Sequence, residues 1–314
     1  MSDLGPKSPL TCKGAVFLAP MAGVNDPVFR AICKRLGANL TYTEMVSAKA
    51  LEYKSLKTKD MLLMLDEEKP AAVQLFGKDP VTLAEQARVL EDSYADGIVL
   101  IDINMGCPSR KIAGKGEGVA LMRDFVLAEQ ILRSVVEAVS LPVSVKFRKG
   151  YEYGDDIAVE FALMAQSCGV AQIAVHGRTA RQQFHGTSDR ELIKRVKAAV
   201  AIPVIASGDV FCAEDIRSYL EDFDADAVMV ARGAQGNPWI FAGRKPPLEE
   251  RVAVALEHAQ GLSQLLPHRL ASMRKHIAWY FKGCDHASAI RRAVQGCVSL
   301  TDYEALLDQI LAWG

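Results

Sequence analysis

The sequence has no long hydrophobic run and no excess of charge of either sign. None of its stretches reaches the roughly 18 uninterrupted apolar residues of a membrane span, and the opening MSDLGPKSPL lacks the apolar segment of a signal peptide. The 37 basic and 38 acidic residues leave a net charge of -1, so no global field attracts nucleic acid. We therefore expect a cytoplasmic protein without a membrane span.

Cysteine is scarce and shows no pairing pattern. The seven cysteines are odd in number and widely spaced, with no C-x-x-C pair. This pattern argues against a disulfide framework or a structural zinc site and favours a reducing compartment. We predict no metal site.

Two nucleotide-binding signatures are also missing. No G-x-G-x-x-G follows the first predicted strand, and the glycines of GKGEG at 114–118 lack the spacing of a triphosphate-binding loop. We interpret 114–118 as a flexible lid.

Short β-rich runs alternate with helical patterns over the first three quarters of the chain. The runs are 15–20, 40–45, 71–76, 98–105, 142–147, 172–177, 202–207 and 227–232. Several are almost continuous Val, Ile, Leu and Ala, as in parallel strands buried on both faces. Asp-Pro pairs at 26–27 and 79–80 predict helix starts, with aspartate as the N-cap and proline in the first turn. Eight such alternations predict an α/β fold, a (β/α)8 TIM barrel.

The sequence changes character after the eighth run. Residues 243–248, GRKPPL, form a break, and from Glu249 onward only helical patterns occur. We therefore predict a barrel domain over 1–242 and a small all-helical domain over 249–314. Within the latter, 269–297 holds six basic residues and one acid, a local net charge of +5. This stretch is either a solvated helical face with packed aromatics or a surface for a phosphate backbone.

Polar residues stand where the predicted strands end, which is where barrel enzymes place their active sites. They are Gln74, Asn104, Cys107, Lys146, Arg148, His176, Arg178, Ser207, Gly208, Asp209, Arg232 and Gly233. The SGD and ARGAQG segments after the last two strands are suited to bind a phosphate monoester. Two ordinary glycine turns would show the same sequence pattern. Cys107 lies between glycine and proline after a core strand, a position that favours reaction over packing.

Several motifs carry a family resemblance. They are LAPMAGVNDPVFR, YTEMVSAKAL, QLFGKDP, DINMGCPSRKI, PVSVKFRKGY, VHGRTARQQF, VIASGDV and MVARGAQGNPWIF, in unbroken order from Phe17 to Phe241, then MRKHIAWYFKG and AIRRAV. Together they resemble the tRNA-dihydrouridine synthases, most closely the B-type bacterial branch. The GCPS motif after a strand ending in asparagine is the most specific of them. Two departures are Ser207, where the family usually has asparagine, and Glu117, where a small residue is usual.

The resemblance implies an FMN-binding barrel and a helical domain that binds tRNA, with NADPH or NADH as the reductant. The implied flavin-binding residues are Pro20, Met21, Ala22, Gln74, Lys146, His176, Ser207, Gly208, Asp209, Ala231 and Arg232. Asn104 and Arg178 would contact the uridine, and Arg274, Lys275, Arg291 and Arg292 would contact tRNA phosphates. The implied reaction reduces the C5–C6 bond of specific uridines, with hydride from the flavin and a proton from Cys107 on the other face of the base.

Two other functions fit parts of the sequence. An FMN barrel acting on a free pyrimidine, like a dihydroorotate or dihydropyrimidine dehydrogenase, would share Lys146 and the phosphate loops but would not need a basic helical tail. A tRNA-binding barrel without catalysis would not need both Cys107 and Lys146. The sequence leaves open which uridine is reduced, the choice between NADPH and NADH, and the oligomeric state.

Overall fold

The computed structural model describes residues 13–313, except the side chain of Lys57. The N-terminal segment in which the sequence predicts no leader lies outside this range. A parallel sheet forms the centre, in the order β2-β1-β9-β8-β7-β6-β5-β4-β3. Its strands are β1 (Ala15–Leu18), β2 (Leu40–Thr41), β3 (Val46–Ser47), β4 (Ala71–Phe76), β5 (Ile98–Met105), β6 (Val143–Gly150), β7 (Gln172–Thr179), β8 (Val204–Ser207) and β9 (Ala227–Val230).

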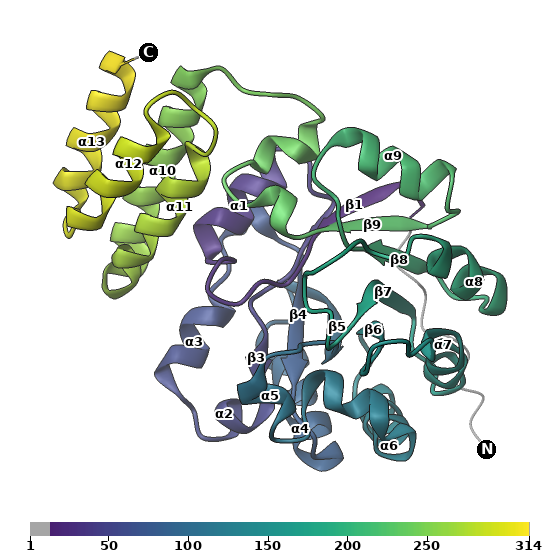
Figure 1. Ribbon diagram of the computed structural model, residues 1–314. Helices are drawn as coiled ribbons and strands as arrows, with labels where there is room; N and C mark the ends of the chain where they lie inside the picture. The colour runs from purple at the N-terminus through teal and green to yellow at the C-terminus, as the bar shows by residue number, and fades with distance from the viewer. Residues whose placement is uncertain (1–12, 314) are drawn as a thin grey trace.

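The sheet curls so that its two edge strands, β2 and β3, are consecutive in the chain (Figure 1). Between them a single parallel bridge joins Tyr42 to Ala72 of β4. The prediction of one strand over 40–45 is wrong, because Thr43 uses its hydroxyl to accept from the Gln74 N–H at 3.2 Å and Glu44 turns inward. Only Leu40–Thr41 of that run forms a strand, and β3 begins just after the run, so the described part of the chain has nine strands where eight are predicted.

Helices cover the outer face of the sheet (Figure 1). They are α1 (Pro27–Arg35), α2 (Ala48–Glu52), α3 (Leu56–Leu62), α4 (Pro80–Ser93), α6 (Phe125–Ala138), α7 (Ala158–Ser167), α8 (Glu191–Ala199) and α9 (Ala213–Glu221), while the short α5 (Arg110–Ala113) belongs to the loop after β5. Both predicted Asp-Pro starts are confirmed. Asp26 accepts from the Phe29 N–H at 3.0 Å and Asp79 accepts from the Thr82 N–H at 2.8 Å, which satisfies otherwise unpaired donors of the first turn.

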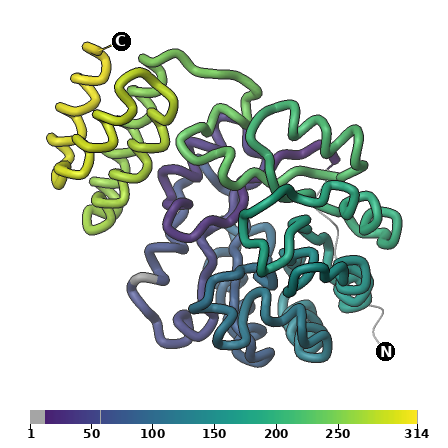
Figure 2. The backbone as a smooth tube through the Cα atoms, in the orientation of Figure 1, coloured from purple at the N-terminus to yellow at the C-terminus, as the bar shows by residue number. Residues whose placement is uncertain are grey.

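The chain is helical from Leu248 to its last described residue. Helices α10 (Leu248–Leu265), α11 (Met273–Tyr280), α12 (Ala287–Ala293) and α13 (Leu300–Trp313) stand together beside α1, at the yellow end of the tube in Figure 2. They surround an apolar cluster that also takes in Val28 and Ile32 of α1 and Trp239 of the preceding turn. The C-terminal helices and the sheet-bearing part therefore share a buried surface.

Two absences concern membrane insertion and disulfides. Among the described residues, no helix combines the length and the apolarity needed to cross a membrane. The six cysteines within 13–313 are all free thiols, as the sequence predicts.

Candidate functional site

One cavity of about 310 Å³ opens at the carboxyl ends of the strands. Residues from seven strand ends or the loops after them line it, which is the expected place for a site in a curled parallel sheet. Twelve of the predicted site residues are among its lining: Pro20, Met21, Ala22, Asn104, Cys107, Lys146, His176, Ser207, Gly208, Asp209, Ala231 and Arg232. The structure thus brings together residues that lie up to 212 positions apart in the sequence.

Lys146 supplies an amine to the cavity wall. Its Nζ has no hydrogen-bond or ion-pair partner among the described residues, although Lys146 lies on β6, an interior strand of the sheet. Burial and the neighbouring charge of Arg148 lower the pKa of Lys146 to about 8, against the opposing effect of Asp102. An amine with this pKa and a free donor is ready to bind an anionic or carbonyl oxygen.

A buried polar chain stands behind Lys146. Asn104 Nδ2 donates to Gln74 Oε1 at 2.8 Å, and Gln74 Nε2 donates to Asp102 Oδ2 at 2.6 Å. Ser144 Oγ donates to the other oxygen of Asp102 at 2.5 Å. Burial raises the pKa of Asp102 to about 6, although both hydrogen bonds oppose the shift. Gln74 is fully buried behind the wall and fixes Asn104, so its predicted bond to a flavin ring would compete with these two partners.

Cys107 stands at the start of the loop after β5, on the cavity wall. Asn104 Oδ1 accepts from the Cys107 N–H at 2.9 Å and from the Gly106 N–H at 3.2 Å, so one amide side chain fixes the turn that carries the thiol. Gly118 packs against this turn, with a positive φ of 61° and no room for a side chain, since a Cβ would lie 2.9 Å from the Cys107 carbonyl oxygen. Burial raises the pKa of the Cys107 thiol, outweighing the nearby cations. The group is therefore a protonated thiol at neutral pH.

His176 on β7 faces the same cavity as a neutral imidazole. Burial first, and then the charges of Arg148, Lys146 and Arg178, hold its pKa well below the usual value. Arg178 Nη1 lies 3.4 Å from His176 Nε2, which as an acceptor leaves the proton on Nδ1.

Arg178 is buried and fully engaged with the protein. It forms a bidentate pair with Asp209, at 2.8 and 2.6 Å, and donates to the carbonyl oxygens of His185 at 3.1 Å and Gly186 at 2.5 Å. With the contact to His176, each of its N–H groups has an acceptor. Its predicted contact with uridine would require exchanging these partners, and the geometry instead makes Arg178 a support for Asp209.

Asp209 and Arg232 form the wall after β8 and β9. Arg232 Nη2 donates to Asp209 Oδ1 at 3.1 Å, and its guanidinium lies over two half-exposed rings, 4.6 Å from the centroid of Phe184 and 5.3 Å from that of Phe211. Gly208 has a φ of 119°, and a Cβ there would lie 2.4 Å from Ser188 Oγ. Only glycine lets the backbone pass this closely.

Sequence reasoning left several lining residues out of the candidate site. They are Met45, Phe184, Phe211 and Gln235. Arg148, which the sequence places at a strand end without a specific role, also lines the cavity, because it follows Lys146 by two positions on one strand and so shares its face. Its Nε donates to the Gly106 carbonyl oxygen at 2.9 Å, and burial lowers its pKa to about 10.

The four basic residues predicted to contact tRNA lie outside the cavity. Arg274 donates to the Cys297 carbonyl oxygen at 2.9 Å, and Lys275 donates to the carbonyl oxygen of Gly23, next to the cavity-lining Ala22. Both are half-buried, whereas Arg291 and Arg292 are exposed on α12.

The side chain of Glu44 also joins the C-terminal helical region to the rim of the cavity. Glu44 accepts from Arg269 at 2.5 Å and from the Gly23 N–H. Of the aromatic residues within 269–297, Tyr280 and Phe281 are buried in the apolar cluster of the C-terminal helices.

The comparisons of sequence point to one family, and the comparison with solved structures shows a shared fold. A family model described as dihydrouridine synthase (Dus) matches residues 17–312. A protein of Xanthomonas campestris pv. campestris called tRNA-dihydrouridine synthase B is 42% identical over 300 residues, covering 91% of this chain and 89% of that one. One of the same name from Vibrio vulnificus is 38% identical over 293 residues, covering 89% and 90%. The solved histamine dehydrogenase of Rhizobium sp. 4-9 shares the fold, with a TM-score of 0.56 at 12% identity over 82% of this chain and 51% of that one. The chain belongs to the dihydrouridine synthase family.

Proposed function

We propose that this protein reduces the C5–C6 double bond of uridines in tRNA to 5,6-dihydrouridine, using FMN and either NADPH or NADH. The observation that carries the proposal is the pairing, in one cavity, of a protonated thiol on Cys107 with an unpartnered amine on Lys146. Saturating an electron-poor double bond needs an acid and a group that stabilises negative charge, and these residues are suited to those two tasks.

The cavity residues fit a flavin mononucleotide. Asp209 is the only carboxylate among the described lining residues and is shared by Arg178 and Arg232, so these two arginines together with Lys146 and Arg148 leave the wall with a net positive charge. A phosphate and a reduced, anionic ring both suit such a wall. The tight backbone at the end of β8 adds the close approach that phosphate binding needs.

Each predicted residue that lines the cavity then has a task. Lys146 would bind the ring and stabilise its negative charge, with His176 beside it, and Pro20, Met21 and Ala22 would form the apolar side of the binding site. Ser207, Gly208, Asp209, Ala231 and Arg232 would hold the ribityl chain and phosphate. FMN, when bound, would supply hydride to C6 of the uracil. Cys107 would protonate C5, and Asn104, held by Gln74, would position both the thiol loop and the base.

We also propose the division into a catalytic (β/α)8 barrel over 1–242 and a tRNA-binding helical domain over 249–314. The separate apolar cluster of α10–α13 and the exposed Arg291 and Arg292 support it. A uridine must leave its stack to enter a closed cavity, so a second surface that binds the surrounding RNA is needed.

The test is a turnover assay with purified protein. The protein should release one FMN on denaturation and form dihydrouridine in an unmodified tRNA transcript with NADPH or NADH, detected by mass mapping. Turnover of free uridine, but not of tRNA, would refute tRNA as the substrate. Protein that carries no flavin after expression with ample riboflavin would refute the cofactor.

A further inference from the structure

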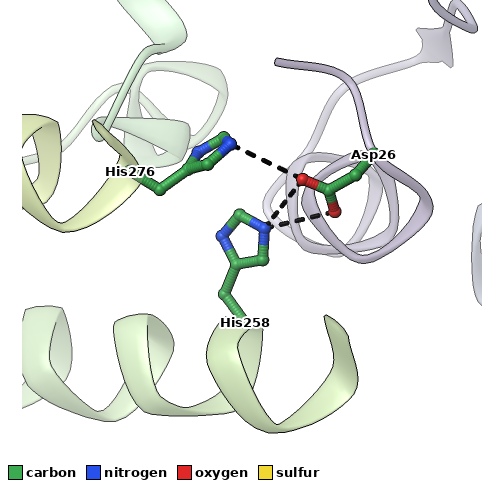
Figure 3. Close-up of side chains that lie close together, drawn as sticks. All are labelled: Asp26, His258 and His276. Atoms are coloured by element: carbon green, nitrogen blue, oxygen red, sulfur yellow. Dashed lines mark hydrogen bonds and ion pairs between the residues drawn. The ribbon is translucent and has the colours of Figure 1, made fainter. Parts of the chain in front are cut away.

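Three buried side chains meet where α1 contacts the C-terminal helices (Figure 3). Asp26 is the N-cap of α1, His258 lies on α10 and His276 on α11. All three are at most 1% exposed, and their potential ligand atoms lie within 4.8 Å of one another. None of them lines the catalytic cavity.

Hydrogen bonding leaves this cluster incompletely satisfied. His258 Nε2 lies 3.0 Å from Asp26 Oδ2, and His258 Nδ1 lies 3.1 Å from the hydroxyl of Tyr280. His276 Nε2 is 3.5 Å from the same carboxylate oxygen, but neither ring nitrogen of His276 makes a hydrogen bond. Leaving two buried imidazole nitrogens unpaired is costly, so the arrangement calls for another partner.

The carboxylate of Asp26 also lacks a permanent counter-charge. Among the described residues its ion-pair partners are the two histidines, with no lysine or arginine. A buried carboxylate beside two imidazoles, without a permanent positive charge, is a set of donor atoms that a metal cation would complete.

We propose that Asp26, His258 and His276 bind a divalent transition-metal ion, with Zn²⁺ as the best match. Two imidazoles and one carboxylate suit zinc, and ligand atoms about 2.0–2.1 Å from a tetrahedral ion lie about 3.3 Å apart. The Asp26 carboxylate oxygen lies 3.0 Å from His258 Nε2 and 3.5 Å from His276 Nε2, on either side of that value, and all three ligand atoms lie within 4.8 Å of one another.

The residues around the three proposed ligands also suit a metal site. Tyr280 orients His258 through its far nitrogen, and the Phe29 N–H holds the carboxylate through Oδ1. Outer partners of this kind fix metal ligands in place. Because the ligands come from α1, α10 and α11, the ion would be a structural link between the barrel side and the tail. No sequence motif marks these ligands, because they are 232 and 18 residues apart along the chain.

The experiment measures metal content and thermal stability. Protein expressed with added zinc, in a Cys212→Ser background that removes an exposed thiol, should retain about one zinc per chain after dialysis. Stripping the metal with dipicolinate should lower Tm, and Zn²⁺ alone should restore it in a concentration-dependent way. The Co²⁺ form should show the visible bands of a nitrogen- and oxygen-ligated tetrahedral ion, without thiolate charge transfer.

Variants identify the ligands. His276→Gln should reduce zinc affinity at least tenfold, whereas the matched control His268→Gln, an exposed histidine bound to Asp60, should retain wild-type zinc content. Absence of retained zinc together with an unchanged Tm on Zn²⁺ addition to wild-type protein would overturn the proposal. So would full zinc content in His276→Gln. The same stripping and Zn²⁺ addition are carried out on the wild-type protein, so this test needs no variant to fold.

Discussion

Replacing Cys107 with alanine should separate the two half-reactions. Burial keeps the pKa of the thiol above its ordinary value, so essentially every molecule carries the proton at neutral pH and the full acid contribution is present. Removing a positioned acid costs about 10²–10⁴ in rate, which corresponds to roughly 2.7–5.5 kcal/mol at 1.36 kcal/mol per decade. Reduction of the flavin by NADPH requires no thiol and should proceed at the wild-type rate.

The assay is anaerobic stopped-flow mixing of reduced enzyme with unmodified tRNA, following flavin absorbance. Cys107→Ser should be almost as slow as alanine, because a hydroxyl is a much weaker acid. Cys168→Ala, at a buried cysteine remote from the cavity, is the matched control and should reoxidise normally. In the wild type the step should slow as pH rises through the thiol pKa. Rapid reoxidation of the Cys107→Ala enzyme would refute the acid role, and loss of flavin together with a lower Tm would mean that Cys107 only packs the loop.

Three further predictions concern charged side chains: the amine of Lys146, the exposed arginines of α12, and the buried Arg30–Glu68 ion pair. Because the Lys146 ammonium is present below about pH 8 and lost above it, FMN affinity of the flavin-free protein should fall through that pH in a fluorescence titration, and Lys146→Met should remove the dependence. Replacing exposed Arg291 and Arg292 with glutamine should weaken tRNA binding and reduce its log–log salt slope by about 0.7–0.9 per lost phosphate contact, without affecting flavin reduction; an unchanged slope would exclude them from the RNA surface. Arg30→Met should destabilise the fold by about 3–5 kcal/mol in urea unfolding, because it leaves Glu68, paired with it at 2.6 Å and fully buried, without a counter-charge; a loss below 1 kcal/mol (about one surface pair) would contradict this.

Local chemistry determined the parts of the fold that the sequence predicted. Both Asp-Pro starts are visible because the capping partner is three residues away, and β5 matches its run because every residue in it is at least half-buried. The run at 40–45 forms a strand only over its first two residues, and no local sequence pattern explains why. Glu44 turns inward to bind Arg269, which lies 225 positions later.

The same distinction applies to the site. Strand-end position found nine lining residues, since the carboxyl ends of parallel strands converge, and the family resemblance added Pro20, Met21, Ala22 and Ala231. It did not reveal that Arg178 is saturated by Asp209, or that Lys275 is directed at the Gly23 carbonyl rather than at solvent. A count of charges along the sequence treats Arg178 and Lys275 as free to bind a ligand, whereas both already have hydrogen-bond partners in the folded protein.

The apolar cluster shared by α1 and the C-terminal helices determines how this protein can be divided. Val28, Ile32 and Trp239 are covered by α10–α13. A truncated protein ending after residue 242 would therefore expose them to water as an apolar patch prone to self-association. The tail is therefore not a detachable module. A chimaera that exchanges tails between relatives, to transfer a preference for one tRNA position, would have to exchange α1 along with them.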